Sequence, residues 1–152
     1  ELKLAEAMLA RARDKYQKER QPGVLRHAQN FFGGVTGGRY GRLYAPLGEQ
    51  TITVEDESSS QKQPSDLSRG TREQLYLALR FGLIREFGES LPVIVDEILV
   101  NFDPERTRRA AEAFSEISRT NQVLVFTCHP AMVEAFQGAC PDAQLIEIES
   151  LR

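Results

Sequence analysis

Two adjacent carboxylates, Asp96 and Glu97, follow the apolar run 91–95. An ionised carboxylate that is buried without a partner costs on the order of tens of kcal/mol. A buried strand ending in such a pair therefore predicts a cation or ligand at its tip. The residue types favour Mg²⁺ carried by a nucleotide, because Mg²⁺ is commonly held by one or two carboxylates together with substrate phosphates.

A second candidate site lies at Ser68, Arg69 and Gly70, where a long helical pattern begins. Ser68 can cap that helix, and Gly70 permits close approach to its backbone. Free N–H groups at a helix N-terminus suit an anion such as phosphate. A plain N-cap without a ligand is the simpler alternative, and these residues alone leave both open.

Two further polar residues stand where elements meet. Asp103 precedes Pro104, and Asp at the N-cap with Pro at the first helical position starts a helix well. His129 comes shortly after the predicted strand 122–127, and a single histidine at a strand end is usually structural. Each residue could also serve a ligand.

From residue 67 onward, helical and strand patterns alternate, which favours parallel βαβ units. Ligands of such sheets gather at the carboxyl ends of the strands, where Asp96, Glu97, Cys128 and His129 all fall. The predicted helices are 69–88, 104–118 and 130–137, and the predicted strands are 92–96, 122–127 and 144–149.

The amino-terminal part predicts helices and then an antiparallel strand pair. Residues 1–20 carry an apolar seam with alternating spacings of three and four, typical of a coiled-coil stem that continues beyond Glu1 or of an ordinary amphipathic helix. A second helix should end near Phe31. The seam consists of Leu2, Ala5, Leu9, Ala12 and Tyr16.

The glycine-rich segment 33–38 is not a phosphate loop, because Arg39-Tyr40 follows where a Lys-Ser/Thr pair should open a helix. It is interpreted as a turn into an antiparallel pair formed by 40–43 and 51–54. The polar segment 55–66 predicts an exposed, mobile loop.

Composition limits the possibilities further. A chain of 152 residues with 41% hydrophobic content suits one globular domain. It has neither a long apolar run nor a secretory signal, so we expect a cytoplasmic protein without a membrane partner. The two cysteines, Cys128 and Cys140, lack zinc-type spacing with His27 or His129 and are interpreted as packed or idle thiols.

Charge is unevenly distributed along the chain. Residues 1–42 carry nine Lys/Arg against four Asp/Glu, whereas the rest carries ten against eighteen. Positive charge near a helical stem could contact nucleic-acid phosphates, and a solvated helix face is the simpler alternative.

Taken in order, these features resemble the ATP-binding cassette ATPases over residues 67–129. The stem and glycine-rich strands before them are similar to the carboxy-terminal lobe of an SMC-like head, most closely the YhaN-like branch. Arg69 and Thr71 depart from the commonest transporter signature, which has Gly and Gln/Glu there. The matching segments are 67–71 (signature), 93–97 (Walker B), 101–103 (D-loop) and 123–129 (switch histidine).

The resemblance implies roles for individual residues. Asp96 would hold Mg²⁺, Glu97 would orient or deprotonate the attacking water, and His129 would contact the γ-phosphate of ATP. Residues 1–31 would form the base of a coiled coil, and 32–152 an α/β P-loop NTPase-like lobe. Contacts to the ATP of the opposite head would come from Ser68, Arg69, Gly70 and Asp103.

The implied function is ATP hydrolysis in a head homodimer that moves coiled coils on DNA, in DNA repair or chromosome maintenance. No Walker A lysine occurs in the 152 residues, so an amino-terminal lobe of the same protein should supply it, and the chain alone should not turn over ATP. One alternative is a non-catalytic module of the same fold that recruits a partner through its stem. Another is a nucleoside-phosphate enzyme of a different P-loop class.

Overall fold

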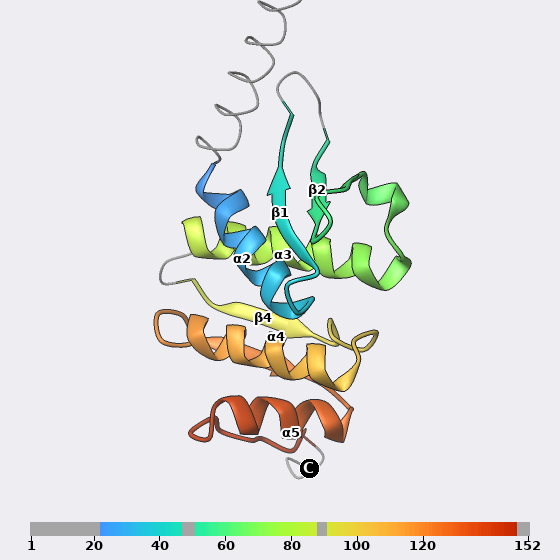
Figure 1. Ribbon diagram of the computed structural model, residues 1–152. Helices are drawn as coiled ribbons and strands as arrows, with labels where there is room; N and C mark the ends of the chain where they lie inside the picture. The colour runs from blue at the N-terminus through green and yellow to red at the C-terminus, as the bar shows by residue number, and fades with distance from the viewer. Residues whose placement is uncertain (1–21, 47–50, 88–90, 149–152) are drawn as a thin grey trace, which may run out of the picture. The chain divides into compact units, whose positions relative to one another are not determined.

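The computed structural model describes residues 22–46, 51–87 and 91–148 (Figure 1). The chain divides into two compact units, Glu1–Glu89 and Ser90–Arg152. The predicted stem 1–20 lies outside the described residues, and the proposed domain boundary after residue 31 stays a prediction. No described helix has both the length and the apolar character needed to cross a membrane.

The first unit combines two helices with a small antiparallel sheet, as predicted. Strands β1 and β2 pair antiparallel, with Leu43 opposite Val54, and β3 continues the sheet beside β2. In chain order its elements are α2 (Gly23–Val35), β1 (Tyr40–Tyr44), β2 (Thr53–Asp56), β3 (Gln61–Lys62), the 3-10 turn η1 (Pro64–Asp66) and α3 (Arg69–Phe87).

Helices α2 and α3 pack closely. The Phe31 and Phe81 rings lie 4.4 Å apart between centroids. At Gly82 the helices approach so tightly that an added Cβ would lie 2.3 Å from the carbonyl oxygen of Val24 and 3.2 Å from the Cβ of Ala28. A glycine is therefore required at this crossing.

The glycine-rich segment is a turn into β1, but it begins later than predicted. Helix α2 runs to Val35 rather than ending near Phe31, so the first two glycines are helical. Gly37 and Gly38 adopt φ values of 67° and 84°, which glycine tolerates without steric cost.

The prediction of an irregular, mobile segment at 55–66 is wrong in part. Residues 57–61 are exposed, but the segment contains β3 and η1. Lys62 Nζ lies 2.8 Å from Asp56 Oδ2, and the backbone N–H groups of Ser58 and Ser60 donate to Asp56 Oδ1. The Lys62 contact, followed by the hydroxyl of Ser58, holds the pKa of Asp56 well below its usual range.

The second unit is the predicted βαβ unit followed by a helix. Strands β4 (Val93–Asp96) and β5 (Val123–Phe126) are parallel and joined through α4 (Pro104–Ile117), and α5 (Pro130–Ala139) packs beside α4 (Figure 1). The core of this unit includes Val95, Leu99, Ala110, Phe114, Ile117 and Met132.

The predicted strand 144–149 is not formed in its described part, 144–148. Leu145, Ile146 and Ile148 are instead 52%, 60% and 67% exposed. The apolar pattern is typical of a strand, but a strand needs a neighbour to accept its backbone hydrogen bonds. No described strand pairs with this segment.

Candidate functional site

The site in the second unit begins with an unusual backbone conformation at Glu97. Directly after β4, Glu97 adopts φ 49°, the left-handed region that non-glycine residues rarely occupy. Such a conformation costs on the order of 1–3 kcal/mol and tends to occur at functional sites. The Glu97 N–H still donates to the Phe126 carbonyl at 3.2 Å, so the residue remains attached to the end of β5.

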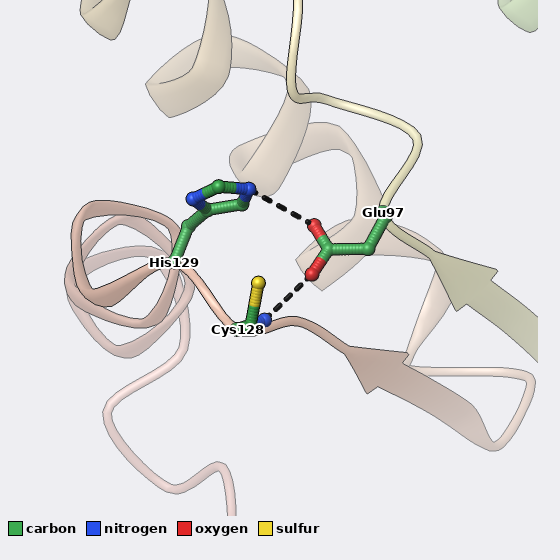
Figure 2. A group of neighbouring side chains, drawn as sticks. All are labelled: Glu97, Cys128 and His129. Carbon is green, nitrogen blue, oxygen red and sulfur yellow. Dashed lines mark hydrogen bonds and ion pairs between the residues drawn. The ribbon is translucent and has the colours of Figure 1, made fainter.

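The Glu97 carboxylate is held by the segment that follows β5 (Figure 2). Oε1 accepts the backbone N–H of Cys128 at 2.6 Å. Oε2 accepts the Thr127 hydroxyl at 3.3 Å. The Cys128 N–H is the main reason that the pKa of Glu97 lies below its usual value, although partial burial opposes this shift. Glu97 is therefore ionised at neutral pH.

His129 lies beside the same carboxylate. Its Nε2 atom is 3.6 Å from Glu97 Oε2, longer than a direct hydrogen bond, and its side chain is half exposed. The backbone of His129 caps α5, with its carbonyl accepting the N–H of Met132. Its own N–H donates to the Thr127 hydroxyl at 3.0 Å. The imidazole is thus anchored at its base and accessible at its tip.

Asp96 and Glu97 are more accessible than the sequence suggested. Asp96 is exposed, and the Glu97 side chain is 33% exposed, so the expectation of two buried carboxylates is wrong for this chain. The carboxylate oxygen of Asp96 has no side-chain partner among the described residues and fits Mg²⁺, which prefers oxygen ligands and often takes one or two carboxylates.

Ser68 caps α3 in the first unit, as predicted. Its hydroxyl oxygen accepts the Thr71 N–H at 3.3 Å and lies 2.8 Å from the Thr71 hydroxyl. Thr71 is buried, whereas Ser68 is exposed and Gly70 has open space where a Cβ would stand. Arg69 is exposed, and its Nε lies 3.1 Å from Glu73 Oε1.

Asp103 caps α4, which confirms the structural role read from the sequence. Its Oδ1 accepts the N–H of Arg106 at 2.9 Å, and Pro104 occupies the first helical turn. Within the second unit, Glu97 and His129 thus lie side by side, whereas the Asp103 side chain is used to cap α4. The three signature residues belong to the first unit.

The sequence placed Cys128 at the ligand-binding edge of the sheet but favoured a packed or idle thiol, whereas Thr127 was not singled out; Cys128 is exposed and therefore not packed. Thr127 and Cys128 are 30 and 31 residues away from Glu97 along the chain. The parallel pairing of Asp96 with Phe126 makes their contacts with Glu97 possible. The only signal in the sequence was that both strands end in polar residues.

Comparisons with known proteins point to one group. No family model matches the chain. YhaN of Bacillus subtilis, an uncharacterised protein, is 35% identical over 129 residues, which cover 83% of this chain and 13% of YhaN. The chain thus spans about one eighth of the length of that relative, since its matched part is 13%.

Solved structures of SMC heads share the fold. One, from a study of ATP-driven dimerisation and DNA-stimulated activation of SMC ATPases, has a TM-score of 0.64 at 20% identity and covers 74% of this chain and 71% of that one. The SMC head domain from Thermotoga maritima has a TM-score of 0.57 at 22% identity, covering 80% and 43%. The chain therefore has the α/β fold of SMC ATPase heads and YhaN as a sequence relative, which confirms the resemblance that its motifs indicated.

Proposed function

We propose that this chain is the carboxy-terminal half of an ATPase head that binds and hydrolyses ATP when two heads dimerise. The observation that carries the proposal is the Glu97 carboxylate held beside His129 at the carboxyl ends of two parallel strands. That edge is where ligands of open α/β sheets bind.

Glu97 acts mainly by its position and its charge. The Cys128 N–H keeps the carboxylate ionised and fixes one oxygen, while Oε2 can accept a hydrogen bond from an attacking water. A carboxylate with a lowered pKa is a weak base, but phosphoryl transfer asks little covalent chemistry of the protein and depends on positioning and electrostatics.

Asp96 and His129 complete the roles proposed for this edge. The Asp96 carboxylate would hold Mg²⁺, which when bound neutralises phosphate charge and orients the phosphates. The accessible tip of His129 would donate a hydrogen bond to the γ-phosphate. Across the dimer, Ser68 and the N–H groups at the start of α3, exposed by Gly70, would bind the phosphates held by the other head.

An amino-terminal lobe carrying a Walker A loop is the proposed partner within the same protein. Parallel sheets are normally covered on both faces. Here one face of the β4–β5 sheet exposes Ile94, Leu124 and Phe126 at 66%, 39% and 44%, beside the Asp96 carboxylate. A lobe packed on this apolar face would lie beside Asp96. The segment 144–148 could then gain the strand partner that it lacks.

Head dimerisation and DNA binding are proposed from the SMC heads that share the fold, because one was studied for ATP-driven dimerisation and stimulation by DNA. Exposed Arg39 and Arg42 on the first unit are available for phosphate contacts. The proposed setting is DNA repair or chromosome maintenance in the cytoplasm.

The test is Glu97→Gln in the parent protein, by which we mean the polypeptide that joins this chain to the proposed amino-terminal lobe. Glu134→Gln on the exposed face of α5 is the matched control. The Gln variant keeps the size of the side chain and loses its charge. We expect it to bind ATP, to accumulate as an ATP-bound dimer in size-exclusion chromatography and to lose turnover. Unchanged ATP turnover in Glu97→Gln would refute the proposal.

A further inference from the structure

We propose that Glu97, Cys128 and His129 together bind a borderline-soft divalent cation such as Zn²⁺, at a site separate from the Mg²⁺ position assigned to Asp96. Figure 2 shows the three side chains converging. One ligand atom of each, a carboxylate oxygen, the Cys128 sulfur and an imidazole nitrogen, lies within 4.8 Å of the other two.

The donor set determines which metal the site selects. Zinc takes thiolate, imidazole and carboxylate ligands at about 2.0–2.3 Å in a tetrahedral arrangement, and sites with three protein ligands leave one open position. Mg²⁺ requires oxygen ligands in near-octahedral geometry and is a poor match for sulfur. A Glu–Cys–His set therefore favours Zn²⁺ or Co²⁺ over Mg²⁺.

The geometry needs only small side-chain movements to close on an ion. Cys128 and His129 are exposed, and their ligand atoms already lie within 4.8 Å of the Glu97 carboxylate oxygen. Glu97 Oε1 is held by the Cys128 N–H. Oε2 accepts the Thr127 hydroxyl at 3.3 Å, lies 3.6 Å from His129 Nε2 and keeps a further lone pair for the metal. Coordination by Cys128 releases its thiol proton to solvent, because the thiolate is the ligand.

This site could not be found from sequence spacing. Cys128 and His129 are neighbours and do not form a zinc pattern with each other or with His27. The third ligand comes from the end of β4, and only the parallel pairing of β4 with β5 brings it into reach. The interpretation of Cys128 as an idle thiol is therefore replaced by a role as a ligand.

The functional consequence rests on the proposed ATPase function. A metal that occupies Glu97 and His129 removes both from the attacking water and the γ-phosphate. Micromolar zinc would then inhibit ATP turnover without competing for the Mg²⁺ position. The binding itself does not depend on the ATPase assignment.

Binding is tested with Co²⁺ alone as the spectroscopic probe, added to the 152-residue chain under reducing conditions. We expect about one equivalent to give the visible bands of tetrahedral cobalt and a near-ultraviolet thiolate charge-transfer band. Cys128→Ser should abolish the charge-transfer band, and His129→Ala should weaken affinity by about tenfold or more. Cys140→Ser is the matched control and should change neither.

Two results would overturn the site: no thiolate band in the unaltered chain, or a band that persists in Cys128→Ser. Excess Mg²⁺ should leave the cobalt spectrum unchanged, and displacement of Co²⁺ by Mg²⁺ would also contradict the assignment.

Inhibition is tested separately in the parent protein, with each variant compared with its own zinc-free rate. We expect zinc to slow the unaltered protein by about tenfold or more while slowing Cys128→Ser far less. Equal inhibition of both would overturn the inhibitory role. Absence of zinc-free turnover would count against the proposed function and leave the cobalt result standing.

Discussion

The Thr127 hydroxyl links Glu97 and His129 by donating to the Glu97 carboxylate at 3.3 Å and accepting the His129 N–H at 3.0 Å. One side chain thus positions both residues proposed to act on ATP. Because the backbone of His129 is fixed by this contact, Thr127 is a positioning residue for the pair.

Thr127→Val should therefore lower kcat for ATP hydrolysis in the parent protein by about tenfold, since a hydrogen bond to a charged group contributes roughly 1.5–3 kcal/mol. Thr127→Ser keeps the hydroxyl and should retain most of the activity. The measurement is steady-state turnover with thermal unfolding as a check on folding. Equal loss in both variants would show that the hydroxyl is not responsible.

The Ser68–Thr71 hydroxyl pair gives Thr71 a role that the sequence left open. Ser68 Oγ accepts the Thr71 N–H, and when the Thr71 hydroxyl also donates to it, the Ser68 proton is left for a phosphate. Thr71→Val should raise the ATP concentration for half-maximal turnover roughly fivefold, equivalent to about 1 kcal/mol.

Thr71→Ser is the conservative partner of that variant and should behave like the unaltered protein. The readout is ATP-dependent dimerisation together with the separation of KM from kcat. If Thr71→Val changed the unfolding temperature but not KM, Thr71 would contribute to packing only and not to ATP binding.

Helix α4 should contribute a pH-dependent term to stability. The Glu105 carboxylate accepts hydrogen bonds from Arg108 and Arg109, which lower its pKa from 4.5 to about 2. A carboxylate with a depressed folded-state pKa stabilises the fold above its unfolded pKa and loses that contribution as pH falls through the folded value.

Glu105→Gln should thus lower the free energy of unfolding at neutral pH, with the difference fading between pH 4.5 and about 2. Urea unfolding of the chain at several pH values measures this. Glu134→Gln, at an exposed position without an ion pair among the described residues, should show a smaller and flatter difference. A Glu105→Gln difference that grows toward low pH would contradict the assignment.

Alanine substitution should have opposite effects at Gly82 of α3, which lies at the crossing with α2, and at Gly34 of α2, which has open space around it. Gly82→Ala places its Cβ against the Val24 carbonyl and should destabilise the chain by about 1–3 kcal/mol. Gly34→Ala, in a helical position with nothing within 4 Å of its Cβ, should stabilise it by about 0.4–1 kcal/mol. Chemical denaturation decides between them, and a neutral Gly82→Ala would mean that the helices can separate at little cost.

The order of elements could be predicted because their signals are local. Asp103 with Pro104 marks the start of α4, and β4 and β5 are each a short apolar run that can be recognised in the sequence without reference to other segments. The βαβ pattern put Cys128 at the same edge as Glu97, but the hydrogen bonds of Thr127 and Cys128 to Glu97 could not be predicted, since they depend on strand register and side-chain direction. The strand predicted at 144–148 is missing for a different reason: the apolar pattern favours a strand, but no described strand lies beside it to pair with its backbone.

Leu145, Ile146 and Ile148 also bear on how such a protein is made in the cell. An exposed apolar segment stays open to self-association until a partner covers it, and the proposed partner lobe is distant in sequence. Long-range pairing of this kind is slow to form. Production of this chain without the proposed amino-terminal lobe should therefore favour aggregates as its concentration rises, so the cobalt and urea measurements belong at low protein concentration. Production together with that lobe should suppress the aggregation.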